Sequence, residues 1–74
     1  METEILKIIA NRCDCDLSEV TDEKHIVDDL NADSLSVVEI IMDLEAEFDI
    51  QITDDEAEEL LTVKQIKDYV EANA

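Results

Sequence analysis

The sequence predicts an all-α fold: a small antiparallel four-helix bundle with three longer helices, one short helix and a long first loop. The 74 residues contain no glycine and no proline, which disfavours strands joined by tight turns. Aliphatic residues recur at helical spacing along most of the chain, and short later connections favour antiparallel neighbours. A chain of this length has room for one domain, residues 1–74, with one small core.

The first predicted helix runs from about Glu2 to Cys13, because apolar residues recur there on one face. These residues are Ile5, Ile8, Ile9 and Cys13. A polar connection follows, over about residues 14–32. We expect its apolar residues to turn inward and to hold the loop against the core. They are Leu17, Val20, Ile26, Val27 and Leu30.

The second predicted helix, from about Ser34 to Asp49, carries two apolar stripes. The stripe expected to face the core consists of Val37, Ile41, Leu44 and Phe48. An adjacent stripe consists of Leu35, Val38 and Met42. This second stripe either widens the contact with the core or stays partly exposed for a partner.

Two capping-box sequences predict the starts of the last two helices. Thr53 and Glu56 have the required spacing before a short third helix, and Thr62 and Gln65 repeat it before the fourth. The apolar residues of these two helices are Ala57, Leu60, Leu61, Val63, Ile66, Tyr69 and Val70.

The charge of the chain restricts its partners. The net charge of −17 comes from 22 acidic and 5 basic residues, and no lysine or arginine lies between His25 and Val63. Such a field repels nucleic acid and anionic lipid and attracts basic protein surfaces, or it is a solvated face that only keeps the protein soluble. No apolar run approaches the ~20 residues of a membrane span, and the acidic N-terminus does not resemble a signal peptide. We therefore expect a cytoplasmic monomer that binds no nucleic acid and does not insert into membranes.

The cysteines and the single histidine do not predict catalysis. Cys13 and Cys15 are too few for a zinc site and awkwardly spaced for a disulfide. Cys13 continues an apolar stripe and is interpreted as a structural thiol, and Cys15 as a loop residue. His25 lies in the predicted loop, and no nucleophile–base pair appears in the pattern. We predict that the chain is not an enzyme.

The polar segment from Asp29 to Leu35 has two interpretations that need no modification. As a calcium loop of the EF-hand type it offers carboxylate and amide ligands, but Ser34 takes the place of the required glycine and Ile40 that of the bidentate glutamate. As a purely structural segment it supplies Asp33 as an N-cap, and Ser36 and Glu39 have the spacing of a further capping box.

A third interpretation rests on a family. The segment Asp33-Ser34-Leu35, followed by an acidic amphipathic helix, resembles the modification site of acyl carrier proteins. The similarity extends to Val-Asp-Asp-Leu-Asn-Ala at 27–32, Val-Glu-Ile-Ile-Met at 38–42 and Ile-Thr-Asp-Asp-Glu-Ala at 52–57. It covers nearly the whole chain and is strongest from Val27 to Glu58.

The resemblance implies a carrier of acyl intermediates, held as thioesters on 4′-phosphopantetheine attached to Ser34. A holo-acyl-carrier-protein synthase would transfer this group from coenzyme A, reading Asp33 and the neighbouring Leu35. Fatty acid biosynthesis is the main interpretation. A specialised carrier for polyketide, lipopeptide, lipid-A-type or D-alanyl transfer is an alternative. Another class also remains open: an acidic helical interaction or divalent-metal-binding domain without a prosthetic group.

Further surfaces follow from this interpretation. Acyl-handling enzymes with basic surfaces are expected to dock on Glu39, Glu45, Glu47, Val38 and Met42. An acyl chain is expected between the second and third helices, against Ile41, Leu44, Ala57, Leu60 and Leu61. Crowded carboxylates predict weak Ca²⁺ or Mg²⁺ binding at Asp28, Asp29, Asp33 and Glu39. Asn31 stands where the family often has glycine and is expected to adopt a left-handed turn. Ser36 and Ala46 replace acidic residues of many fatty-acid carriers, which leaves the partner enzymes open.

Overall fold

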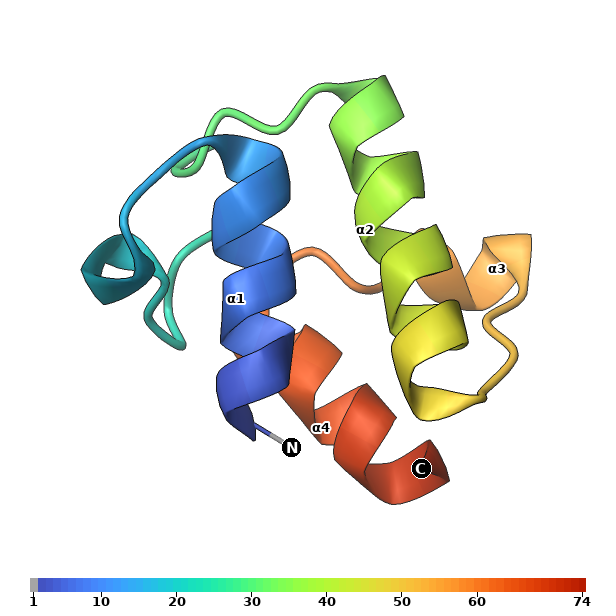
Figure 1. Cartoon of the computed structure of the whole chain (residues 1–74). Coiled ribbons are helices and arrows are strands. Elements are labelled where there is room, and N and C mark those ends of the chain that lie inside the picture. The colour runs from blue at the N-terminus through green and yellow to red at the C-terminus, as the bar shows by residue number, and fades with distance from the viewer. Residues whose placement is uncertain (1) are drawn as a thin grey trace.

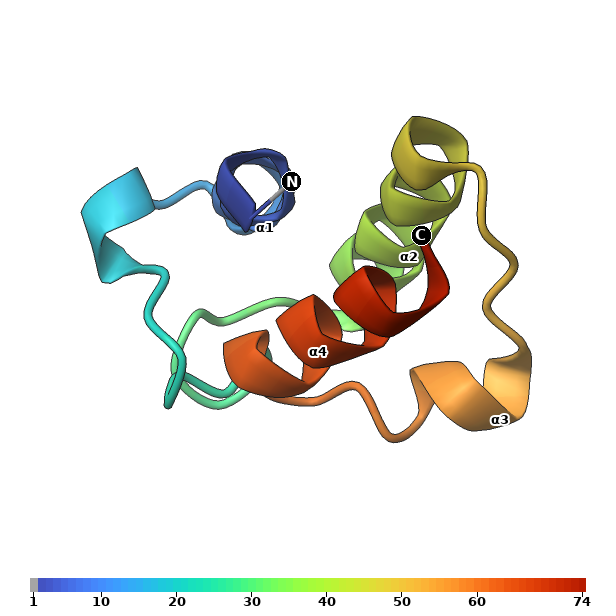
Figure 2. The ribbon, with the colours of Figure 1, turned by 90° about the horizontal axis from the view of Figure 1, so that it is seen from below.

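The computed structural model describes residues 2–74 and confirms the all-α fold. Its elements are α1 (Glu2–Cys13), the 3₁₀ turn η1 (Leu17–Glu19), α2 (Ser34–Phe48), α3 (Asp54–Ala57) and α4 (Val63–Asn73). Helices α1 and α2 lie side by side and run in opposite directions, joined by the long first loop (Figure 1). Helix α4 crosses below them, and α3 lies beside α2 (Figures 1 and 2). Within residues 2–74, no helix is long and apolar enough to cross a membrane.

Short-range hydrogen bonds explain where the last two helices begin. Thr53 and Glu56 form a reciprocal capping box at the start of α3, and Thr62 and Gln65 form another at the start of α4. Each pair satisfies backbone N–H groups that have no partner inside the helix. Both predicted boxes are therefore confirmed. The third candidate box is wrong, because Ser36 lies inside the first turn of α2.

The core consists of aliphatic side chains from every long helix, from the first loop and from the connections before and after α3. Its members are Ile5, Ile9, Ala10, Val20, Ile26, Leu30, Ala32, Ile40, Ile41, Leu44, Ile52, Leu60, Val63, Ile66 and Val70. On α2, Ile41 and Leu44 are buried as predicted, but Val37 and Phe48 are only half-buried. Ile40 is fully buried although it lies outside the predicted stripe. Helix α2 packs against α1 as well as against the rest of the core, so its buried sector is wider than one stripe.

The first loop is held by a backbone bridge to the segment before α4. The Ile26 N–H donates to the Leu61 carbonyl oxygen at 2.9 Å, and the Val63 N–H donates to the Lys24 carbonyl oxygen at 3.0 Å. The turn that follows His25 leaves Ile26 buried and Val27 exposed.

Two of the five loop residues predicted to turn inward do not do so. Val20, Ile26 and Leu30 are buried as predicted, but Val27 and Leu17 are exposed. Leu17 begins the single turn of η1, and that turn brings Val20 rather than Leu17 into the core.

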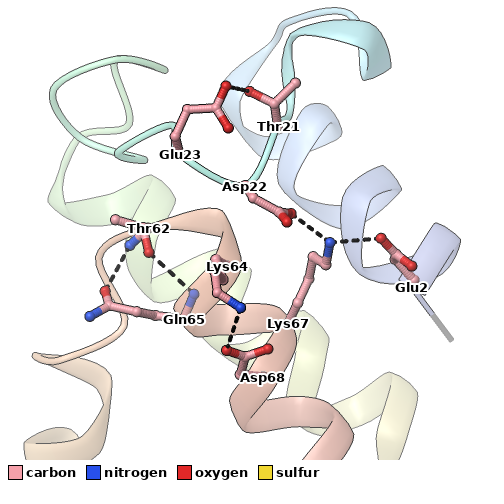
Figure 3. A network of polar contacts seen from close by, with 9 residues as sticks. All are labelled: Glu2, Thr21, Asp22, Glu23, Thr62, Lys64, Gln65, Lys67 and Asp68. Carbon is pink, nitrogen blue, oxygen red and sulfur yellow. Dashed lines mark hydrogen bonds and ion pairs between the residues drawn. The ribbon is translucent and has the colours of Figure 1, made fainter.

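Lys67 joins three segments that are distant in the sequence. Its ammonium lies 2.7 Å from Glu2 Oε1 on α1 and 2.5 Å from Asp22 Oδ1 in the first loop (Figure 3). The Lys67 side chain is only 13% exposed. Its pKa is raised above the ordinary value, chiefly by the hydrogen bond to Asp22 and then by the one to Glu2. Lys67 therefore connects α4 to α1 and to the loop.

Candidate functional site

Ser34 is the first residue of α2, and its side chain is exposed. Its hydroxyl has no hydrogen-bond partner within residues 2–74, so it is open to another molecule. Backbone N–H groups at a helix start, together with the helix dipole, favour a phosphate there. The position therefore fits a serine that accepts a phosphoryl-linked group.

Asp33 caps α2 immediately before this serine. Its carboxylate accepts a hydrogen bond from the Ser36 N–H at 2.8 Å, and this bond is the main reason that the pKa of Asp33 lies below its ordinary value. The carboxylate is therefore ionised at neutral pH and exposed beside the Ser34 hydroxyl. The cap that the sequence predicted and the acidic residue that the family resemblance implied are the same side chain.

The segment before Asp33 positions the start of α2. Asn31 has φ 61°, so the expected left-handed turn is confirmed. The next residue, Ala32, is buried, and its N–H donates to the Ile26 carbonyl oxygen at 2.9 Å. The His25 N–H donates to Asp29 Oδ2 at 2.8 Å. These hydrogen bonds hold the end of the first loop, just before α2, against the part of the loop that bridges to the segment before α4.

The weak divalent-metal site expected at Asp28, Asp29, Asp33 and Glu39 stays a prediction. Within residues 2–74, no group of three or more His, Cys, Asp or Glu side chains is arranged to hold a metal ion. Each of the proposed ligands lies in a different local arrangement. Asp28 is exposed, Asp29 accepts a hydrogen bond from His25, Asp33 caps α2, and Glu39 pairs with Arg12.

The second apolar stripe of α2 is an exposed ridge. Leu35 is 66% exposed, Val38 51% and Met42 60%. Large exposed apolar side chains gathered on one helix face are typical of contact surfaces. We call these three residues the α2 ridge. Of the two predicted possibilities for this stripe, exposure is the one observed.

The three acidic residues expected at this surface differ in their surroundings. Glu47 is exposed. Glu45 is half-buried, and its Oε2 accepts a hydrogen bond from the Ile52 N–H at 2.8 Å. Glu39 accepts a hydrogen bond from Arg12 Nη1 at 3.1 Å. Only Glu47 of the three therefore lacks a partner among residues 2–74.

Arg12 is the residue near this surface that the sequence reasoning missed. Its Nε lies 2.7 Å from Asp43 Oδ2, and its Nη2 lies 3.2 Å from Asp43 Oδ1. The hydrogen bond to Asp43 is the main reason that the pKa of Arg12 is above its ordinary value. A cation in the last turn of α1 could be noticed in the sequence, but its partners lie on another helix.

A cavity of about 190 Å³ lies between α2 and α3. It is lined by Val37, Val38, Ile41, Met42, Glu45, Ile52, Asp54 and Ala57. Of the residues expected around an acyl chain, Ile41 and Ala57 line it. Leu44 and Leu60 are buried in the core without lining this cavity, and Leu61 is exposed. Helix α3 ends at Ala57 after one turn, so Leu60 and Leu61 lie beyond the helix on which they were expected.

Both cysteines are half-buried and unpaired, and each packs against the core. Burial is the main cause of the raised pKa of each thiol, which disfavours a reactive thiolate. They line a cavity of about 460 Å³ under the first loop, together with mostly polar residues. The surroundings of Cys13 agree with its interpretation as a structural thiol, and Cys15 lies in the loop as interpreted and packs against the core there.

The chain is similar to known carrier proteins over nearly its whole length. Residues 3–70 match the family described as "Phosphopantetheine attachment site". An acyl carrier protein of Syntrophobacter fumaroxidans (strain DSM 10017 / MPOB) is 49% identical over 73 residues, which are 99% of this chain and 90% of that protein. A solved structure of the acyl carrier protein from Enterococcus faecalis matches with a TM-score of 0.84 and 44% identity, covering 99% of this chain and 92% of that one. The chain belongs to the acyl carrier protein family, and it carries acyl groups on covalently attached 4′-phosphopantetheine.

Proposed function

We propose that Ser34 is the attachment residue and that the loaded chain serves fatty acid biosynthesis. The observation that carries this proposal is the exposed, unbonded Ser34 hydroxyl at the start of α2, next to the ionised Asp33. Both other serines differ from it in position: Ser18 lies in η1, and Ser36 is half-buried in the first turn of α2.

The prosthetic group supplies a terminal thiol on which the thioester forms. The chain's own contribution is to present the reacting hydroxyl on a rigid helix end, where the helix dipole favours the phosphodiester. Asp33 adds a fixed negative charge that a synthase can read. Leu35 adds an exposed apolar contact one residue beyond the hydroxyl.

Intact mass spectrometry tests the attachment residue. The purified chain is incubated with coenzyme A, Mg²⁺ and a holo-acyl-carrier-protein synthase. We expect one phosphopantetheine adduct on the wild type and on Ser36→Ala, and none on Ser34→Ala. Circular dichroism of each variant controls for folding. An adduct on folded Ser34→Ala, or no adduct on the wild type, would refute the proposal.

We also propose that the acyl chain enters the cavity between α2 and α3. A cavity of ~150 Å³ with apolar walls is enough to hold a benzene molecule in another protein, so a site of about 190 Å³ can take the first part of an acyl chain. Each buried CH₂ contributes ~0.8 kcal/mol, which offsets the cost of widening the cavity. Ile41 and Ala57 are the residues expected to contact the chain from its two sides.

Thermal unfolding of the holo and octanoyl forms tests this entry route. We expect the octanoyl form to have the higher melting midpoint, and the amide resonances of Ile41 and Ala57 to shift. Leu17, exposed on the far loop, serves as the control position and should not shift. Equal midpoints and unchanged resonances would show that the chain stays outside.

The proposal includes a cytoplasmic monomer that is loaded by a synthase, meets acyl-handling enzymes with basic surfaces, and does not itself catalyse a reaction. Sedimentation of the purified chain tests the monomer, and cell fractionation tests its location. Elongation of malonyl and acyl groups on this chain by purified fatty-acid synthesis enzymes tests the pathway. Transfer by those enzymes at a rate far below that with a known fatty-acid carrier would favour the specialised-carrier alternative.

A further inference from the structure

Arg12 is the cation that contacts α2 in this structure. It lies in the last turn of α1 and reaches across to two carboxylates, Asp43 through two hydrogen bonds and Glu39 through one at 3.1 Å. Within residues 2–74, no other lysine or arginine forms an ion pair with α2. The guanidinium geometry permits this forked contact, which a lysine cannot reproduce.

The two carboxylates held by Arg12 border one side of the α2 ridge. Glu39 lies one helical turn after Leu35, and Asp43 directly follows Met42. Residues three or four apart are neighbours on a helix surface, so Glu39 is close to the exposed ridge side chains. A partner protein that covers the ridge therefore meets these carboxylates with Arg12 already bound to them.

The opposite side of the ridge carries no such cation. Glu45 is held there by the uncharged Ile52 N–H, and its negative charge is not compensated. The carboxylates of α3 (Asp54, Asp55 and Glu56) continue the negative field on that side. On the α1 side, two carboxylates and one guanidinium leave a local charge of about −1 instead of −2. The field around the ridge is therefore asymmetric.

We propose that Arg12 is a specificity-determining residue of the docking surface. It competes inside the molecule for Glu39, so that a partner's cation gains less from Glu39 than from the carboxylates on the α3 side. Partners that place their basic residues toward α3 are thus favoured over partners that place them toward α1. This inference rests on the proposed function, because it concerns the synthase that loads Ser34 and the enzymes that act on the loaded chain.

The experiment measures kcat/KM for loading of Ser34 by the synthase, at about 0.05 M and about 0.5 M NaCl, where screening differs strongly. The variants are Arg12→Gln, Arg12→Lys, Glu39→Gln and the double variant Arg12→Gln/Glu39→Gln. Lys7→Gln is the matched control, because Lys7 is exposed on the same helix, makes no ion pair with α2, and loses the same charge. Circular dichroism and the melting midpoint of each variant establish that it is folded at the assay temperature.

The expected effects follow from the strength of exposed charge pairs, which change an equilibrium by about 1.4- to 5-fold. Arg12→Gln should raise kcat/KM about threefold at low salt and lose most of this gain at high salt. Glu39→Gln should change the wild-type value less than about twofold, but lower the Arg12→Gln value about threefold or more. The kcat/KM of Arg12→Lys should fall between those of wild type and Arg12→Gln. The kcat/KM of Lys7→Gln should stay within about twofold of wild type.

If Arg12 only stabilised the packing of α1 against α2, Arg12→Gln would lower the melting midpoint without changing the salt dependence of loading. Equal loading of folded Arg12→Gln and wild type would overturn the inference. So would an equal effect of Glu39→Gln in both backgrounds, or an equal gain in Lys7→Gln. If the wild type itself is not loaded at Ser34, the proposed function fails. If loading is normal but independent of Arg12, only the present inference fails.

Discussion

At the scale of single residues, side chains near the helix ends connect local structure to the site. Asp33 satisfies a backbone N–H of α2 and at the same time presents its charge beside Ser34. Tyr69, on α4, also makes two contacts. Its hydroxyl donates to Glu56 Oε2 at 2.8 Å and lies 3.2 Å from the Gln51 carbonyl oxygen. Tyr69 therefore attaches the short α3, which borders the cavity of about 190 Å³, to α4.

Replacing Tyr69 with phenylalanine tests this contact. The hydrogen bond lowers the pKa of Glu56, so its contribution to stability is present above the unfolded-state value of about 4.3 and is lost as pH falls through the folded-state pKa. The pKa of Tyr69 is raised by the same bond, and that contribution is lost only as pH rises through its folded-state pKa. At pH 7 we expect Tyr69→Phe to melt a few degrees lower than wild type, with a smaller difference in acid.

Carbon-detected NMR titration of the Glu56 carboxyl group provides the second readout. The pKa of Glu56 should rise in Tyr69→Phe, because its strongest hydrogen-bond donor is gone. Thr53, which also bonds Glu56, remains in the variant. An unchanged Glu56 titration would mean that the Tyr69 contact does not persist in solution.

At the scale of the element, α2 presents surfaces with different roles. One side is buried in the core through Ile40, Ile41 and Leu44. The α2 ridge faces outward, and carboxylates flank it. Burial of a few apolar side chains supplies contact free energy, whereas rim charges mainly set the association rate and its salt dependence. We therefore expect the ridge and the charges to affect loading in different ways.

Met42→Gln tests the ridge. We expect it to raise KM for the synthase by about two- to tenfold, because an exposed contact side chain of similar size becomes polar. The melting midpoint should stay close to that of wild type, since Met42 packs little against the core. Leu17→Gln is the matched control, because Leu17 is exposed in the first loop and away from α2. An equal rise of KM in both variants would count against a specific role for the ridge.

At the scale of the whole molecule, a net charge of −17 on 74 residues opposes the compact state. We therefore expect ion pairs of the five basic residues to stabilise the fold most where they join distant segments. Arg12 joins α1 to α2, and Lys67 joins α4 to α1 and to the first loop (Figure 3). Lys64, in contrast, pairs with Asp68 one turn later on the same helix. The two lysines of α4 thus differ in the range of the contacts that they make.

Lys67→Gln and Lys64→Gln form a matched pair for this comparison. Each removes one positive charge from α4, so their effects on the net charge are equal. We expect Lys67→Gln to lower the melting midpoint by several degrees at pH 7 and Lys64→Gln by far less. Because the pKa of Lys67 is raised on folding, its contribution is fully present at pH 7 and disappears only in strong alkali. Equal midpoints of the two variants would show that stability depends on the net charge and not on the contacts of Lys67 with α1 and the first loop.

The sequence by itself determined what depends on neighbouring residues. The two capping boxes, the left-handed Asn31, the position of α2 and the placement of Ser34 at its start follow from side chains within a few residues of one another. Such patterns can be recognised in the sequence because a cap or a helical stripe depends only on residues a few positions apart. The proposal that Ser34 carries the prosthetic group came from the family resemblance, because periodicity alone does not contain it.

Only the tertiary structure decided how side chains distant in the sequence meet. Ile40 is buried although it lies outside the predicted stripe, and Val27 is exposed although it was expected to turn inward with Ile26. Three carboxylates that are close in the sequence have different partners: Asp29 accepts a hydrogen bond in the first loop, Asp33 caps α2, and Glu39 pairs with Arg12. Each of the five basic residues has many possible acidic partners in this chain. Packing of the helices selects among them, because ion pairs form only where the backbone brings both groups within a few ångströms.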